Sequence, residues 1–135
     1  MKKLLSTKYS TGAFSVATLI LRLGSGVLLM HHGYDKLIHF GTMQNTFTNF
    51  MGIGSSLSLS LDIFAEFFCA LFVALGLFTR LSTIPIIIAM SVAFFQAHKG
   101  DIFGKGELSA LFLTAFLVIL LVGPGKVSVD GMVGK

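Results

Sequence analysis

One apolar stretch, residues 57–78, limits what this chain can fold into more than any other feature. It is long enough to cross the hydrocarbon core of a bilayer as a helix, yet it contains two carboxylates, Asp62 and Glu66. Because these residues are four apart, a helix places both on one face. The opposite face carries only bulky apolar residues: Phe64, Phe67, Phe68, Leu71, Leu75 and Phe78. This pattern predicts a membrane helix whose bulky face meets lipid and whose carboxylates face other helices.

Three further apolar runs accompany this stretch in a chain of 135 residues. The chain is 54% hydrophobic and only 12% charged, with a mean hydropathy of +0.87, which is typical of a membrane protein. We therefore predict an all-α integral membrane protein, a single four-helix bundle over residues 1–135. The transmembrane helices are expected at residues 13–32, 57–78, 81–98 and 107–122. A short interfacial helix is expected between the first two, where apolar residues recur at helical spacing: Met43, Phe47, Phe50 and Met51.

Glycines in and after the first apolar run have two expected roles. Gly24 and Gly26 lie inside the run and would let another helix approach closely. Gly33 follows His31 and His32, and it is expected to end the first helix as a C-terminal cap.

Basic residues predict the orientation in the membrane. If the N-terminus is inside, six basic residues lie on the inner side and three, Lys36, Lys99 and Lys105, on the outer side. This bias favours a multi-pass protein of the bacterial inner membrane with both termini in the cytoplasm. The basic residues form no patch, so the lipid bilayer and not nucleic acid is the expected partner. The single cysteine, Cys69, argues against a disulfide-relay enzyme or a thiolate metal site.

Ionisable residues are expected to gather in the outer half of the bundle. Counted inward from the outer helix ends, Arg22 and Glu66 each lie about 14 Å deep at 1.5 Å per residue, which predicts an ion pair between them. Asp62 would lie about 6 Å nearer the outer surface. The other candidates, His32, His98 and Glu107, are expected at the outer ends of the helices. The candidate ligand-binding or proton-relay residues are therefore Arg22, His32, Asp62, Glu66, His98 and Glu107.

Two interpretations of these residues stay open. In the first, the Arg22–Glu66 pair is structural and the histidines anchor helix ends, since buried pairs are often structural. In the second, the pair forms the floor of a polar pocket that opens outward, since charges in spanning helices usually mark function. A zinc, iron or haem site is a minor alternative, and no metal is predicted, because no histidines have i,i+4 spacing and no His-Glu-x-x-His occurs.

Several short motifs occur in an order that resembles the DoxX family of small four-helix bacterial membrane proteins. They are Arg22, His32-Gly33-x-x-Lys36, Glu66, Gly76-Leu77-x-Thr79-Arg80, His98, Gly106-Glu107 and Gly123-Pro124-Gly125-x-x-Ser128-x-Asp130. The resemblance implies a link to quinone-coupled oxidation, as in the small subunit associated with a thiosulfate:quinone oxidoreductase. It also implies links to oxidative-stress responses and to membrane-associated oxidoreductase complexes. The family's candidate functional residues would be Arg22, His32, Glu66, His98 and Glu107.

These observations favour an inner-membrane redox-accessory protein that binds a quinone or similar lipophilic molecule and works with an oxidoreductase partner. The sequence has no dinucleotide fingerprint, P-loop or cysteine pair, so no intrinsic cofactor is expected and electrons would come from a partner or the ligand. Whether the chain itself is an enzyme stays open. One alternative is a structural or assembly subunit without a ligand. Another is a small transporter or proton channel, which would need to form a homo-oligomer.

Overall fold

The computed structural model describes residues 4–134, and every regular element among them is helical. In chain order the elements are α1 (Thr11–Ile38), α2 (Phe40–Met43), α3 (Ser55–Ile63), the π-helical segment η1 (Phe64–Cys69), α4 (Ala70–Leu75), α5 (Thr79–Val92), the π-helical segment η2 (Ala93–Ala97), α6 (Glu107–Val122) and α7 (Val129–Met132). The elements α3, η1 and α4 form one continuous helix, Ser55–Leu75, and α5 and η2 form another, Thr79–Ala97. The predicted all-α class is confirmed for the described residues.

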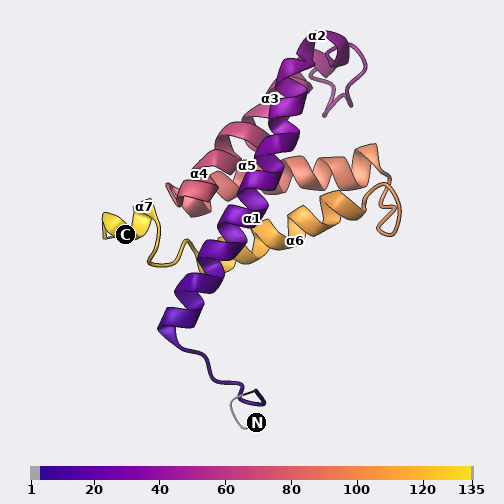
Figure 1. Cartoon of the computed structure of the whole chain (residues 1–135). Coiled ribbons are helices and arrows are strands. Elements are labelled where there is room, and N and C mark those ends of the chain that lie inside the picture. The colour runs from indigo at the N-terminus through magenta and orange to yellow at the C-terminus, as the bar shows by residue number, and fades with distance from the viewer. Residues whose placement is uncertain (1–3, 135) are drawn as a thin grey trace.

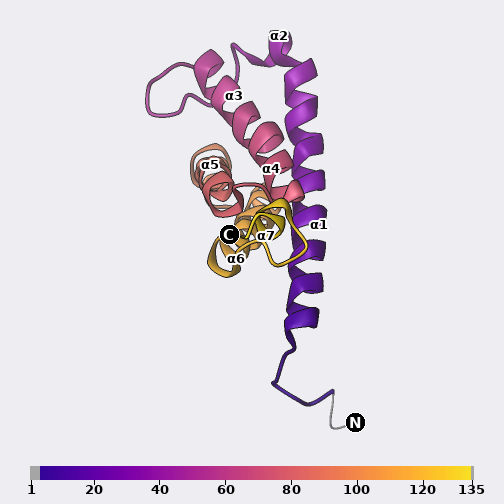
Figure 2. The same cartoon turned by 90° about the vertical axis from the view of Figure 1, so that its left-hand side faces the viewer.

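Two antiparallel helix pairs build the molecule (Figure 1). In the first pair, α1 and the Ser55–Leu75 helix run in opposite directions and pack against each other. In the second pair, α5 and α6 are joined by the loop that follows η2. After a quarter turn α1 stands upright while α5 and α6 are seen nearly end-on (Figure 2). In Figure 1 α1 leans in the direction in which α5 runs, so the two pairs cross obliquely. The chain after α6 then folds back toward the corner between α4 and α5.

Three helices are long and apolar enough to cross a membrane: α1, Ser55–Leu75 and Thr79–Ala97. Their most apolar 18-residue windows have mean hydropathies of 1.8, 1.9 and 1.5. The fourth, α6, has 16 residues and is about 24 Å long at 1.5 Å per residue, somewhat less than the roughly 30 Å of a hydrocarbon core. These lengths and compositions are those of a membrane helical bundle.

The core lies where the four long helices meet. Its buried apolar residues are Leu29, Ala65, Cys69, Ala70, Val73, Ile86, Met90, Phe112, Phe116 and Ile119. The predicted two-faced character of the Ser55–Leu75 helix is confirmed, because Glu66 and Cys69 are buried whereas Phe64 and Phe68 are exposed. The exposed phenylalanine face is therefore available to lipid, and the carboxylate face packs inside the molecule.

The first helix continues about one and a half turns beyond the residue expected to end it. Gly33 lies inside α1 and is buried against the backbone of η1. A Cβ atom at this position would lie 2.7 Å from the carbonyl carbon of Glu66 and 2.7 Å from the amide nitrogen of Phe67. The prediction that Gly33 caps the helix was wrong, because this glycine serves a close backbone contact between two helices and not a turn.

Gly26 makes a second close contact on the same face of α1. A Cβ atom there would lie 3.0 Å from the carbonyl oxygen of Ala70. Gly24 faces away from this contact, since nothing lies within 4 Å of a Cβ built on it. The expected close approach is thus confirmed at Gly26, and among the described residues no helix packs against Gly24.

The connection between the first two long helices contains one short helix, α2, which ends at Met43. The helix expected across residues 43–51 does not form. Met51 and Gly52 both have positive φ values, 52° and 80°, which a right-handed helix excludes. The hydroxyl of Ser58 instead accepts a hydrogen bond from the amide of Phe50 at 2.9 Å and holds this segment against the start of α3.

We expect Gly33→Ala to lower the free energy of unfolding by about 1–3 kcal/mol, because the added methyl group overpacks the contact between α1 and η1. Gly24→Ala is the matched control, since its methyl group meets open space and should be neutral or stabilising. Thermal unfolding of both purified variants in one detergent measures the effect. An unchanged midpoint for Gly33→Ala would contradict the close helix contact.

Candidate functional site

One face of α1 carries a series of buried residues that pack against the second long helix and, near the start of α1, against the C-terminal segment. Its buried members are Ser15, Thr18, Arg22, Gly26, Leu29 and Gly33. These residues are three or four positions apart, which is the spacing of a single helix face. Lys36 is the next position in this series. Because α1 continues to Ile38, Lys36 lies one turn beyond Gly33 and faces the carboxylates of the second helix.

Lys36 joins both of these carboxylates. Its Nζ lies 2.6 Å from Oδ2 of Asp62 and also pairs with Oε2 of Glu66. The side chain of Glu66 is only 2% exposed, that of Asp62 10% and that of Lys36 24%. A carboxylate withdrawn from water requires a nearby cation, and Lys36 supplies it to both. We call these three residues the lysine–carboxylate cluster.

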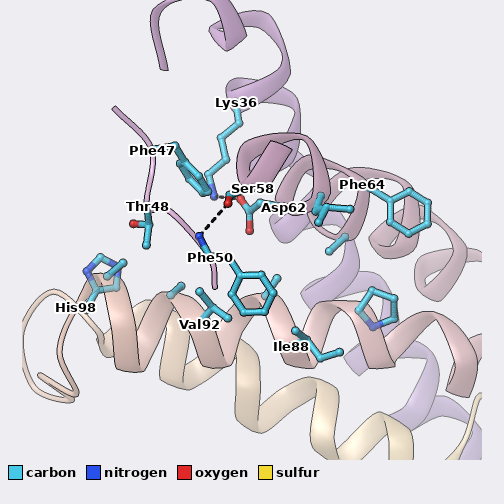
Figure 3. A pocket seen from close by; sticks show the side chains of 16 residues that line it. Lys36, Phe47, Thr48, Phe50, Ser58, Asp62, Phe64, Ile88, Val92 and His98 are labelled. Carbon is cyan, nitrogen blue, oxygen red and sulfur yellow. Dashed lines mark hydrogen bonds and ion pairs between the residues drawn. The ribbon is translucent and has the colours of Figure 1, made fainter. Parts of the chain in front are cut away.

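A cavity of about 490 Å³ lies beside the lysine–carboxylate cluster, between α3, α5 and the segment before α3 (Figure 3). Eleven of its sixteen lining residues are apolar. The polar ones are Lys36, Thr48, Ser58, Asp62 and His98. Figure 3 shows Lys36 extending from α1 to Asp62 on one wall, with Ile88 and Val92 of α5 on the opposite wall. Mostly apolar walls with a few polar groups are the usual form of a small-molecule site, and such sites measure about 300–1,000 Å³.

Both π-helical segments border this cavity. Phe64 and Ala65 of η1 line it from one side, and Ala93 and Ala97 of η2 line it from the other. The wider winding of η2 ends with a bond from the amide of His98 to the carbonyl oxygen of Ala93 at 2.9 Å. π-Helical turns are rare and occur frequently at functional sites. Their position on two sides of one cavity therefore supports its assignment as the candidate site.

The predicted ion pair between Arg22 and Glu66 was wrong. Nη1 of Arg22 donates to the carbonyl oxygen of Ala74 at 3.4 Å, and Nη2 donates to the carbonyl oxygen of Val127. Ala74 lies about two helical turns beyond Glu66. The error came from counting depth from His31 as the end of the first helix, since the actual register places Gly33 opposite Glu66.

Arg22 belongs to a structural corner between α4 and α5 that the C-terminal segment completes. Oδ1 of Asp130 accepts a hydrogen bond from the amide of Phe78 at 3.0 Å, and Oδ2 accepts from the amide and the hydroxyl of Thr79, both at 2.9 Å. The carboxylate therefore caps the first turn of α5 from a distant part of the chain. The amide of Asp130 also donates to the carbonyl oxygen of Gly76 at 2.8 Å. The Gly76 and Ser128-x-Asp130 motifs thus have a structural explanation.

The remaining candidates lie in three different surroundings. His98, partly buried at the end of η2, lines the cavity. His32 does not line it, and its ring packs edge-on against Phe112 with centroids 5.9 Å apart. Glu107 is exposed in the first turn of α6, where a carboxylate complements the helix dipole. Within residues 4–134 no three His, Cys, Asp or Glu side chains come together as metal ligands.

The structure thus brings Asp62 and His98 to one cavity, pairs Glu66 with Lys36 beside it, and leaves Arg22, His32 and Glu107 outside it. Lys36 is the functional candidate that sequence reasoning missed. The three-and-four spacing that runs from Arg22 through Gly33 to Lys36 was the signal that could have identified it.

The long apolar helices and the charged cluster buried between them define a small helical membrane protein with a ligand-sized cavity beside that cluster. The family model for DoxX matches residues 17–99, and the chain belongs to the DoxX family, as its motifs predicted. The matched residues include the whole lysine–carboxylate cluster and the whole lining of the cavity. Comparisons with curated proteins and with solved structures give no match.

We expect Lys36→Met to lower the free energy of unfolding by about 3 kcal/mol, because it leaves the carboxylate of Glu66 buried without its cation. Adding Glu66→Gln to that variant should recover much of the loss, since the remaining group is uncharged. Lys105→Met, at an exposed loop position, controls for the loss of one charge. Thermal unfolding in detergent measures all three. Equal losses in the single and double variants would contradict the pairing of Lys36 with Glu66.

Proposed function

We propose that this protein is a four-span protein of the bacterial inner membrane that binds a quinone or a similar lipophilic molecule and works with an oxidoreductase partner. The observation that carries the proposal is the 490 Å³ cavity beside Lys36, with its mostly apolar lining. A quinone has an apolar ring and tail and two carbonyl oxygens, which accept hydrogen bonds. It therefore requires apolar walls and a small number of donors.

Lys36 and His98 are the donors that suit such a ligand. A lysine ammonium group has three N–H donors, and in this protein Asp62 and Glu66 engage two of them. The third can bond to a quinone carbonyl oxygen in the cavity. His98 lines the same cavity, and an imidazole ring can both donate and accept a hydrogen bond, which suits contact with a quinone carbonyl or a quinol hydroxyl. These roles replace those expected of Arg22 and His32, which lie outside the cavity.

The electrons in this proposal come from a partner or from the ligand. The chain has one cysteine and no dinucleotide-binding fingerprint, so it offers no familiar site for a redox cofactor. The protein would hold the quinone and exchange protons, while an oxidoreductase subunit reduces or oxidises it. This division of labour fits the membership of the DoxX family and the position of the cavity among apolar helices.

We propose an orientation with both termini in the cytoplasm, which the distribution of basic residues favours. The spans are α1, Ser55–Leu75, Thr79–Ala97 and α6. In a Cys69→Ala background, we expect a membrane-impermeant maleimide to label Lys105→Cys in intact spheroplasts and to label Lys126→Cys only after lysis. Both residues are exposed, so they are matched in accessibility. The opposite labelling pattern would reverse the orientation.

We expect the purified protein in nanodiscs to bind a labelled ubiquinone or menaquinone analogue saturably. A labelled ligand is needed because the chain has no tryptophan for fluorescence quenching. Ala93→Phe should weaken binding by at least about tenfold, because the added ring occupies the cavity. Leu111→Phe adds a ring at an exposed position of α6 and should bind like the unaltered protein.

Two results would overturn the quinone proposal. One is the absence of saturable binding by a protein that remains folded. The other is an equal affinity in Ala93→Phe and Leu111→Phe, which would place any bound quinone outside the cavity. A stoichiometric protein partner recovered in mild detergent, together with either result, would instead support an assembly subunit.

A further inference from the structure

A second cavity, of about 530 Å³, lies at the other end of the molecule from the α5–α6 loop. It forms where the start of α1, the end of α6 and the C-terminal segment meet. Its lining residues are Tyr9, Thr11, Phe14, Ser15, Arg80, Val122, Pro124, Gly125, Lys126 and Gly131. None of them belongs to the lysine–carboxylate cluster, so this cavity is a separate site.

The charge of this second cavity is positive. Arg80 and Lys126 line it, and none of its lining residues is acidic. The nearest acid in sequence, Asp130, directs its carboxylate to the amides of Phe78 and Thr79. The cavity also includes Thr11, the first residue of a 28-residue helix, whose N-terminal end carries a partial positive charge. These groups together attract an anion.

The guanidinium group of Arg80 is held in place and not merely exposed on the surface. Its Nε donates to the carbonyl oxygen of Leu120 at 3.1 Å, and its Nη2 donates to that of Leu121 at 3.4 Å. These carbonyl groups belong to the last turn of α6, where the helix lacks backbone partners for them. The chain then turns sharply at Gly123, whose φ of 84° favours glycine. This turn brings the chain next to the guanidinium group of Arg80, and the residues that follow it, Pro124 and Gly125, line the cavity.

The remaining walls are apolar and lie at helix ends. Phe14, Val122 and Pro124 line the cavity next to the two cations. Phe14 lies in the first turn of α1 and Val122 in the last turn of α6. Helix ends of a spanning bundle lie at the level of the lipid headgroups. The cavity thus offers cations for a phosphate and apolar side chains for the beginning of an acyl chain.

We propose that this cavity binds the headgroup of an anionic phospholipid, with the phosphate held between Arg80 and Lys126. Basic pockets between membrane helices commonly bind such headgroups. The proposal does not depend on quinone binding at the other cavity. A soluble phosphate compound would be recognised by the same groups. The competition experiment below distinguishes a lipid phosphate from a soluble one.

Native mass spectrometry of the detergent-purified protein, titrated with phosphatidylglycerol or with phosphatidylcholine of the same acyl chains, tests this site. We expect phosphatidylglycerol to bind more tightly. Lys126→Glu should weaken its binding by at least about fivefold and leave phosphatidylcholine binding unchanged. Lys105→Glu, the same charge change at an exposed loop position, should have no effect. Lys126 is the main test residue because its side chain is exposed, so its replacement should not disturb folding.

Competition with inorganic phosphate and glycerol 3-phosphate identifies the source of the phosphate group. We expect neither to displace phosphatidylglycerol, because neither contacts the apolar walls. Displacement by either compound at the affinity of the lipid would overturn the assignment to a lipid. Equal binding of the two lipids, or an equal effect of Lys126→Glu and Lys105→Glu, would overturn the site itself. Arg80→Gln, if folded, should reproduce the effect of Lys126→Glu.

Discussion

The close contact of α1 with the Ser55–Leu75 helix determines where Arg22 and the lysine–carboxylate cluster lie. In a membrane, apolar side chains gain little by leaving lipid, so helices associate mainly through van der Waals packing of small residues. Gly26 and Gly33 provide that packing by letting the backbone of α1 touch its partner helix. Such a contact allows one register. That register places Arg22 beside Ala74 and, four turns along, Lys36 beside Glu66.

The charged residues at the two ends of this helix contact have different bonding partners. At the Arg22 end, charged groups bond to the backbone: Arg22 to carbonyl oxygens and Asp130 to amides. These bonds join helix ends and hold the C-terminal segment, so the residues have a structural purpose. At the Lys36 end, charged side chains bond to one another beside an open cavity. Charges that support no backbone turn and border an open volume are better candidates for binding a ligand.

The sequence predicted the helices better than it predicted the contacts between them. Apolar runs and the two-faced pattern at residues 57–78 reflect local physics, namely the length of a bilayer crossing and the periodicity of a helix. The register between two helices depends on which glycines of one helix contact the other. The local sequence pattern does not distinguish Gly24 from Gly26 and Gly33, although only the latter two make this contact. Treating Gly33 as a cap shortened α1, and that one error produced the false Arg22–Glu66 pair and hid Lys36. The Asp130 cap joins residues about 50 positions apart, which no periodicity shows.

The charges around the two cavities indicate two different kinds of ligand. At the first, one amine faces two carboxylates, so the lysine–carboxylate cluster disfavours an anion and suits a neutral molecule with acceptor oxygens. At the second, two cations face no acidic lining residue, which suits a phosphate group. Both cavities add apolar walls to these polar groups, so each suits a molecule that partitions into a bilayer. The two cavities share no lining residue, so the two proposed ligands would not compete for the same groups.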